Sequence, residues 1–429
     1  MSRGQSSPIR VRFCASRLTD GAGLVLLRRL WDTLGLGART DALNVGGRYR
    51  SSLIVESWIA LLWYGGERLD DLRLLAGRGV RRLFGWKRVP DPTTVGRWLR
   101  RAGARMSAHL DEMLWWVVCQ RWRSVGVPRE VMLCLDSTVV VRYGTKQAGA
   151  EKGYNPKKPG RPSHHPLVAF LGNTGDCLGV RWRPGSASAA AGAIPWLRLL
   201  VERLRSAGVE QITVRLDKGF WSRAMVEALE DLQVSYLLKV PDHAWVRGLL
   251  GPRRRSRKDP RLWTATGPMW GARLMSIEER VSVTELDQLE LGTYTIKKRA
   301  HVLTNIEDIH AVTAWRSYNA GTAVEHRIEE LTQLGVGRTS IDHIGGNALL
   351  WSLGALAYEL IHFVRTTALQ GSWRSAQPAR LRAFLIRLPA RITTHSRKWY
   401  LQLVRGEPLR PIFLRALRIV GNTGPPIPA

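Results

Sequence analysis

Two aspartates interrupt stretches of the chain that are otherwise apolar. Asp136 lies within "VMLCLDSTVV", and Asp217 closes "ITVRLD". A buried carboxylate without a partner costs several kcal/mol, or its pKa shifts until it is neutral. If both stretches are strands of one α/β sheet, the two carboxylates come close and repel each other. A divalent cation removes both penalties, and ligation by oxygen alone selects Mg²⁺ or Mn²⁺.

A third carboxylate is then expected, and "YNAGTAVEHRIEEL" supplies it. Tyr318, Glu325 and Thr332 recur every seven residues, so they share one face of a helix. We choose Glu325 as the third acid, and Glu329 on the same side is its competitor. The alternative is a surface helix whose glutamates pair with Arg327 and its neighbours.

The overall charge indicates the class of partner. The chain holds 65 Lys and Arg against 35 Asp and Glu, a net charge of +30 with a pI near 11.1. Such a charge favours a polyanion, nucleic acid before an acidic membrane surface. The four cysteines are scattered, which disfavours a zinc site and fits a reducing cytoplasm. The apolar stretch 349–364 contains Glu359 and His362, so we expect a buried helix and no membrane span.

Hydrophobic periodicity divides the chain into helical and strand-rich parts. Residues 24–63 predict helices that end in glycines. From residue 131 the pattern predicts the order β-β-β-α-β-α-β, a mixed sheet with helices packed on it. Later parts are predicted as a strand-rich insertion (241–300), a helix (318–332), a buried helix (346–365) and a basic C-terminal segment.

Basic residues gather on one predicted helix and one loop. In "PDPTTVGRWLRRAGARM" Asp91 and Pro92 predict a helix start, and Arg97, Arg101 and Arg105 follow at four-residue spacing. One basic face suits insertion into a DNA groove, and an amphipathic surface helix is the alternative. The loop 145–166 is rich in Gly and Pro and carries four cations: Lys152, Lys157, Lys158 and Arg161. These cations would contact a DNA backbone, and a solvated flexible loop is the alternative.

Several of these pieces, in this order, resemble the DDE transposases of bacterial insertion sequences. The most specific are "LDSTVVVRYGTKQAGAEKGYNPKKPGRPSHHPLVAF", "RPGSASAAAGA", "VRLDKGF" and the helix that contains Tyr318. The resemblance covers most of the chain. It is closest to the group with a strand-rich insertion between the second Asp and the Glu, the IS-four and IS-thirteen-eighty types.

The resemblance implies a fold, a site and a reaction. It implies an α/β protein with an RNase H-like mixed-sheet catalytic core, an inserted β-rich subdomain and an α-helical N-terminal DNA-binding domain. Asp136, Asp217 and Glu325 would hold two Mg²⁺ or Mn²⁺ ions, with Asp136 between them, and two metals suit in-line phosphoryl transfer. Cut-and-paste transposition would follow, with a homodimer on the terminal inverted repeats and target DNA, in the bacterial cytoplasm on the nucleoid.

The implied division has five segments. They are a helical DNA-binding domain, the first part of the core, the β-rich insertion, the second part of the core with the Glu helix, and a basic tail: 1–125, 126–240, 241–300, 301–370 and 371–429. An aromatic residue of the insertion would stack on an unpaired base, and the candidates are Trp245, Trp263 and Trp270.

The chain departs from its relatives on the Glu helix. They carry an Arg where this chain has Gly321 and a Lys where it has Thr332, whereas Tyr318 matches. Either other residues such as Arg327 contact phosphate there, or this copy is weakened. A sequence-specific DNA-binding protein derived from a transposase is therefore the alternative function, and a simple nuclease and a glycosidase are more distant ones.

Overall fold

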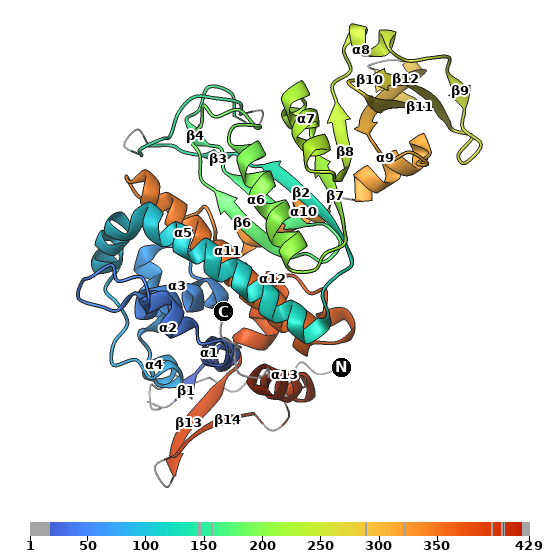
Figure 1. Ribbon diagram of the computed structural model, residues 1–429. Coiled ribbons are helices and arrows are strands. Elements are labelled where there is room, and N and C mark those ends of the chain that lie inside the picture. The colour runs from blue at the N-terminus through green and yellow to red at the C-terminus, as the bar shows by residue number, and fades with distance from the viewer. Residues whose placement is uncertain are drawn as a thin grey trace.

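The computed structural model describes most of the chain: residues 18–144, 147–155, 158–287, 290–320, 323–395, 398–404, 406 and 408–422. A large mixed sheet lies beside a group of long helices, and a strand-rich arm extends from one edge of the sheet (Figure 1). The protein is thus of the α/β class, as predicted.

Five strands form the part of the sheet that carries the two aspartates. Their spatial order is β6-β5-β2-β7-β8; β6, β2, β7 and β8 run in one direction, and β5 runs antiparallel to them. With α6 and α7 between the strands, the predicted order β-β-β-α-β-α-β is confirmed. The bounds are β2 Glu130–Ser137, β5 Leu167–Leu171, β6 Cys177–Arg181, α6 Ala193–Ser206, β7 Gln211–Leu216, α7 Arg223–Asp231 and β8 Ser235–Val240.

Successive side chains of β2 point to opposite faces of the sheet, and each face packs against a different hydrophobic cluster. Leu133 and Leu135 pack with the side chains of α6 and α7, whereas Cys134 faces the core of the long helices. Asp136 follows Cys134 by two residues and shares its face. The apolar run of β2 is explained because helices cover both faces of the sheet.

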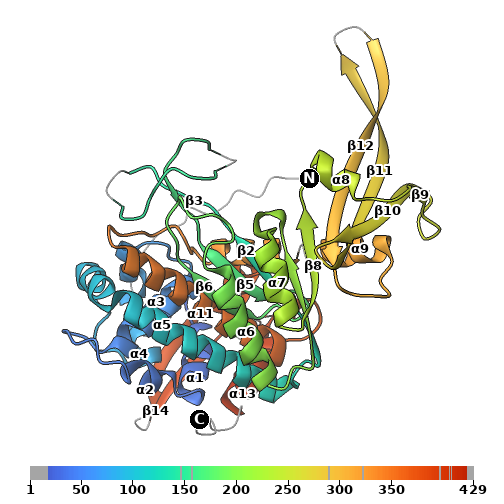
Figure 2. The ribbon, with the colours of Figure 1, turned by 45° about the horizontal axis from the view of Figure 1, so that its top comes forward.

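The segment after β8 continues the same sheet. β12 pairs antiparallel with β8, and β11 and β12 form a long hairpin that projects from the molecule (Figure 2). The helix α9 packs on β10, β11 and β12. The bounds are α8 Ala244–Gly248, β9 Arg254–Arg255, β10 Leu262–Met269, β11 Ala272–Asp287, β12 Glu290–Thr304 and α9 Ala311–Ala320.

The long helices share one hydrophobic core with residues from both ends of the chain. The helices α5 and α11 lie side by side, and α11 is the one helix of the described chain apolar and long enough to cross a membrane. Of its most apolar 18-residue window, 94% is buried within the protein, so α11 is the predicted buried helix. The bounds are α1 Leu24–Thr33, α2 Leu36–Asp41, α3 Ser51–Tyr64, α4 Arg78–Phe84, α5 Pro92–Val125, α10 Ala323–Gln333 and α11 Ile344–Ala368.

The C-terminal residues return to the N-terminal helices. Strand β13 pairs with the short β1, and α13 packs on α1. The remaining bounds are β1 Leu18–Thr19, β3 Val140–Val141, β4 Ser163–His164, α12 Pro378–Leu381, β13 Ala390–His395, β14 Lys398–Leu403 and α13 Arg410–Asn422, with short 3₁₀ or π turns at Leu69–Ala76, Lys218–Phe220, Gly371–Trp373 and Arg382–Ile386.

Helix α5 starts as predicted but is not one straight basic helix. The Asp91 carboxylate accepts hydrogen bonds from the backbone N–H groups of Thr93 (2.9 Å) and Thr94 (3.3 Å). Gly103 then adopts φ 43°, ψ −135°, which is not helical. The prediction that Arg105 continues the face of the two arginines before this break is therefore wrong, because four-residue spacing gives one face only in an unbroken helix.

The predicted helix 318–332 is also corrected. The structure places Tyr318 in α9 and Glu325 in α10, so the seven-residue spacing does not align them on one helix. Gly321, between the two helices, lies outside the described residues. Thr332 is exposed on α10, and its hydroxyl donates to the Ile328 carbonyl (2.9 Å).

Candidate active site

The strand register brings the two aspartates to the same end of the sheet. In the parallel pair β2–β7, Leu135 is opposite Leu216, and each aspartate is the next residue. Leu216 is in turn opposite Leu238 of β8, so Lys239 continues the row. Three ionisable side chains therefore leave neighbouring strands at their carboxyl ends, where open α/β sheets place their sites.

The electrostatics of Asp136 link the three predicted acids. Burial, together with the carboxylates of Asp217 and Glu325, raises its pKa to about 6. The Ser137 N–H donates to its carboxylate (2.7 Å), and this hydrogen bond and the Arg215 guanidinium act in the opposite direction. Asp217 and Glu325 are thus close enough to Asp136 to oppose its ionisation.

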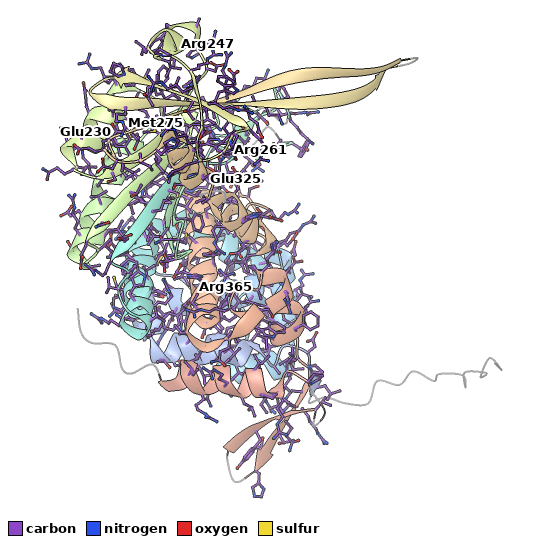
Figure 3. All side chains as sticks on the ribbon, turned by 90° about the vertical axis from the view of Figure 1, so that its right-hand side faces the viewer. Glu230, Arg247, Arg261, Met275, Glu325 and Arg365 are labelled. Carbon is purple, nitrogen blue, oxygen red and sulfur yellow. The ribbon has the colours of Figure 1, made fainter. Side chains whose placement is uncertain are left out.

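Glu325 reaches this cluster from the first turn of α10 and is exposed. Figure 3 shows it between the strand-rich part, marked by Met275, and the helical part, marked by Arg365. Glu329 lies 3.7 Å from the ring of His326 on the exposed side of α10. Its described contact is thus with a neighbour on its own helix, which favours Glu325 as the third acid.

Tyr318 and Lys239 contact the second aspartate. The Tyr318 hydroxyl donates to Asp217 Oδ1 (3.4 Å), and Lys239 Nζ lies 4.0 Å from the same oxygen. Burial raises the pKa of Tyr318, and the nearby carboxylates add to the rise, so its hydroxyl remains a donor. The predicted Tyr318 is therefore part of the cluster, although it lies on α9.

Arg215 is a member of the site that the sequence analysis missed. Its side chain is 7% exposed, and Nε donates to the Tyr318 carbonyl (2.8 Å). Its guanidinium carbon lies 4.4 Å from the centroid of the Tyr318 ring. The sequence contained a signal for this residue. Arg215 interrupts an apolar strand two residues before Asp217, so it lies on the same face of the strand as that acid.

The structure places Arg327 away from the acids. It is two residues from Glu325 on α10, about 200° around the helix. Its Nη1 donates to the Glu330 carboxylate (3.1 Å), and its guanidinium lies against Gly175, where a Cβ would be 3.2 Å away. Arg327 thus does not replace the absent cations beside Glu325.

Glu330 fixes α10 to the core. Its carboxylate accepts from Arg365 of α11 (2.8 and 3.3 Å), and both side chains are almost fully buried. Arg365 also donates to His362 Nδ1 (3.0 Å) and to the Ala376 carbonyl (3.1 Å). The position of Glu325 therefore depends on a buried ion pair one and a half turns further along its helix.

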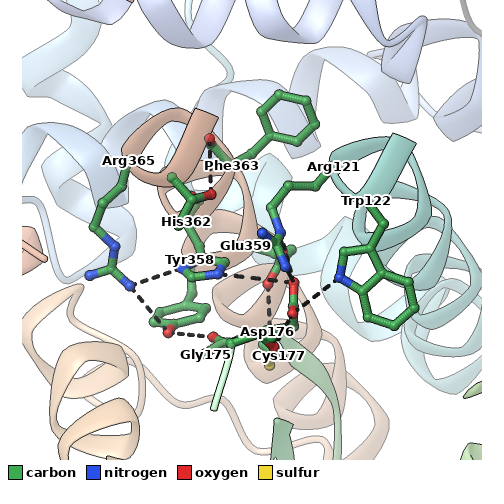
Figure 4. A network of polar contacts seen from close by, with 12 residues as sticks. Arg121, Trp122, Gly175, Asp176, Cys177, Tyr358, Glu359, His362, Phe363 and Arg365 are labelled. Atoms are coloured by element: carbon green, nitrogen blue, oxygen red, sulfur yellow. Dashed lines mark hydrogen bonds and ion pairs between the residues drawn. The ribbon is translucent and has the colours of Figure 1, made fainter. Parts of the chain in front are cut away.

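A second group of buried acids lies behind this pair (Figure 4). Asp176, Glu359 and His362 each place one possible metal-ligand atom within 4.8 Å of the others. The Arg121 guanidinium already pairs with Asp176 and lies 3.7 Å from Glu359. Burial, followed by the Asp176 carboxylate, raises the pKa of Glu359 well above its usual value, which favours its neutral form.

The tautomer of His362 also disfavours a metal there. Arg365 can only donate, so Nδ1 of the ring accepts and the proton is on Nε2. A metal on Nε2 would require the proton on Nδ1, facing a guanidinium. Burial and the guanidinium groups of Arg121, Arg365 and Arg327 hold the pKa of His362 well below its usual range, which keeps the ring neutral. The group is best described as a structural network closed by Arg121.

Predicted DNA-contacting residues of the loop are exposed where they are described. Lys152, Lys158 and Arg161 are on the surface, and Lys157 lies outside the described residues. Lys158 and Arg161 gather around the exposed ring of Tyr143, 4.9 and 5.8 Å from its centroid. Arg97, Arg101 and Arg105 are exposed on α5, and Arg101 Nη2 donates to the Gly46 carbonyl (2.7 Å).

An aromatic cluster follows the second aspartate. Trp221, four residues after Asp217, stacks on Trp270 with centroids 5.4 Å apart and lies 5.6 Å from Trp245. Trp245 is 51% exposed, unlike the partly buried Trp263 and Trp270. Of the three insertion tryptophans, Trp245 therefore offers the most open ring.

The family profile "Transposase DDE domain group 1" matches residues 1–424. The chain belongs to this family. The predicted relationship to DDE transposases is therefore confirmed, whereas the subgroup and bacterial origin stay predictions. Curated proteins yield no match. Among solved structures, a synaptic complex of the piggyBac transposase with hairpin DNA is similar to this protein. The similarity covers 84% of the present chain and 80% of the piggyBac chain, at 14% sequence identity and a TM-score of 0.43.

Proposed function

We propose that this protein cuts DNA at the ends of a mobile element and joins those ends to target DNA, with Asp136, Asp217 and Glu325 as the catalytic acids. The observation that carries the proposal is their convergence: two leave adjacent strands in register, and the third raises the pKa of the first. Family membership supplies the reaction class.

The three acids suit Mg²⁺ or Mn²⁺, two ions in the proposed site. All donors are carboxylate oxygens, which hard divalent cations prefer. Among the described contacts Asp136 has no ion pair, and burial together with the neighbouring carboxylates of Asp217 and Glu325 raises its pKa, so a cation beside it would be stabilising. Bound divalent ions supply neutralisation of phosphate charge and a more acidic water.

The chain's own residues position the reacting groups. Tyr318 and Lys239 hold the Asp217 carboxylate between them, and Arg215 supplies a fixed positive charge beneath the cluster. A water attacks phosphorus at the element end, and the P–O3′ bond breaks to leave a 3′-hydroxyl. That hydroxyl then attacks a target phosphodiester, and a 3′-hydroxyl of the target leaves.

The surrounding architecture supports the same assignment. The order β6-β5-β2-β7-β8, with only β5 antiparallel to the other four strands, supports the assignment of an RNase H-like core. We assign DNA binding to the helices before β2 and to the exposed cations of the 145–166 loop, with Trp245 as the base-stacking ring. A homodimer on two element ends, and a place on the bacterial nucleoid, complete the proposal.

The deciding experiment uses the purified full chain and linear DNA that carries the terminal inverted repeats flanking its gene. Wild-type protein with Mg²⁺ should release 3′-hydroxyl ends and join them to a plasmid. Asp136→Asn should reduce cleavage by about a hundredfold or more. Asp231→Asn, which alters an exposed aspartate paired with Arg198, is the matched control and should cut normally. Equal cutting by Asp136→Asn would reject the assignment.

A second candidate is a DNA-binding protein that has lost cleavage. Thr332 supports this alternative, because relatives carry a Lys at this position. The Thr332 hydroxyl instead donates to the Ile328 carbonyl of its own helix. Repeat-specific binding with no cutting in Mg²⁺ or Mn²⁺ would favour this alternative. Cutting without joining would indicate a simple nuclease.

A further inference from the structure

A basic cavity opens at the opposite end of β2 from the acids. It has a volume of about 490 Å³ and lies where the end of α5, the turn between β5 and β6, α11 and the loop after Trp373 meet. Its lining includes four arginines and no carboxylate: Arg121, Arg327, Arg365 and Arg374.

The charge around this cavity is not balanced. Arg121 pairs with Asp176, and Arg365 and Arg327 share Glu330. Burial of Glu359, the third acid behind the cavity, raises its pKa well above the usual value, which favours its neutral form. Four guanidinium groups thus outnumber the carboxylates with which they pair, those of Asp176 and Glu330, which leaves an excess of positive charge.

Several donors at the cavity have no acceptor within the described residues. Arg121 uses Nε and Nη2 for Asp176, which leaves Nη1, and Arg327 uses Nη1 for Glu330, which leaves Nη2. Arg374 is exposed, and no described contact engages its guanidinium. His362, 2% exposed, also lines the cavity, and its Nε2 lies 4.0 Å from Asp176 Oδ1 without a hydrogen bond.

We propose that this cavity binds a phosphate group. Guanidinium edges grip phosphate oxygens in pairs, and three such edges from different elements converge here. The hydroxyl of Ser375 adds a neutral donor at the mouth. Two buried guanidinium groups, held in place by carboxylates behind them, distinguish this site from loose surface arginines.

The cavity is separate from the catalytic acids. Val127 and Pro128 line it, and Asp136 stands near the far end of β2, about 20 Å along the strand. A phosphate here is therefore not the scissile one. Arg327 nevertheless shares α10 with Glu325, so a bound phosphate would contact the helix that carries a catalytic acid.

The phosphate has two possible sources, the DNA backbone or a free anion, and two measurements on the full chain separate them. The first is thermal unfolding in sodium phosphate against sodium chloride at equal ionic strength. The second is fluorescence anisotropy with a 20-base-pair duplex over a range of salt. The variants are Arg374→Ala and Arg374→Ala/Arg327→Gln, and Arg380→Ala is the control, an exposed arginine of the same segment outside the cavity.

If the cavity binds a free anion, phosphate should raise the unfolding temperature of the wild type and of Arg380→Ala. Arg374→Ala should then need about ten times more phosphate for the same rise. For DNA, Arg374→Ala should lower the slope of log K against log salt by about one, and Arg380→Ala should lower it less. If neither measurement distinguishes the cavity variants from Arg380→Ala, the proposal is overturned. Neither readout requires cleavage, so loss of the proposed function would not mimic this result.

Discussion

The guanidinium of Arg215 lies beneath the ring of Tyr318, with Cζ 4.4 Å from the ring centroid, and donates to the carbonyl of the same residue at 2.8 Å. One buried cation thus connects strand β7 to the end of α9. It also lowers the pKa of Asp136 against the effect of burial. Arg215 therefore contributes to the ionisation of an acid that it does not touch.

Replacing Arg215 by Met should raise the pKa of Asp136 further above 6. The acid limb of the pH profile for Mg²⁺-dependent cleavage should then move to higher pH, because the carboxylate must ionise to bind the ion. Arg215→Lys keeps the charge and should move the limb less. A fall in rate that is equal at every pH, with no movement of the limb, would mean that Arg215 only supports the fold.

The pKa of Asp136 also predicts a dependence of stability on pH. Its folded value of about 6 exceeds the ordinary value of 3.8, so its contribution to stability is full below about pH 4 and is lost as the pH rises through 6. Without divalent ions, Asp136→Asn should therefore raise the unfolding temperature at pH 8 by about 1–3 °C.

The same substitution should have almost no effect on unfolding at pH 4, where the native carboxyl is protonated. Calorimetry in a chelating buffer at both pH values is the measurement. If Asp136→Asn were instead less stable than the wild type at pH 8, the ionised carboxylate of Asp136 would have to be stabilised by more than the described contacts.

Breaking the buried pair beneath α10 should be costly. Glu330→Gln leaves Arg365 without its carboxylate in a site where both side chains are under 5% exposed, and the loss should be about 3–5 kcal/mol of unfolding free energy. Glu227→Gln, which removes the exposed partner of Arg223, should cost about 1 kcal/mol or less. Urea unfolding of the two variants gives the comparison, and equal losses would contradict the anchoring role of Glu330.

The exposed ring of Trp245 should matter for unpaired DNA. Trp245→Ala should weaken binding of a single-stranded oligonucleotide by about 1–3 kcal/mol, the usual value of one base stacked on an aromatic ring. Tyr400→Ala removes an aromatic ring that is 44% exposed on β14 and should leave the affinity unchanged. Titration of a labelled oligonucleotide tests both, and full affinity in Trp245→Ala would exclude stacking on this residue.

The sequence by itself determined the two aspartates, the order of the core elements and the polyanion partner. An acid within an apolar strand is visible because strand periodicity and burial cost are local properties, and parallel pairing then aligns strand ends. The assignment of Glu325 needed the family resemblance in addition, because nothing local distinguishes one exposed glutamate of α10 from another.

Only the tertiary structure decided which cations accompany the acids. It placed Arg215 under Tyr318, turned Arg327 to the far face of α10, interrupted α5 at Gly103 and gathered four arginines around a distant cavity. Side-chain partners depend on how helices cross a sheet, and contacts between residues more than a hundred positions apart leave no periodic trace in the chain. The pattern along the sequence therefore fixes which residues cannot face water, whereas packing fixes what they face instead.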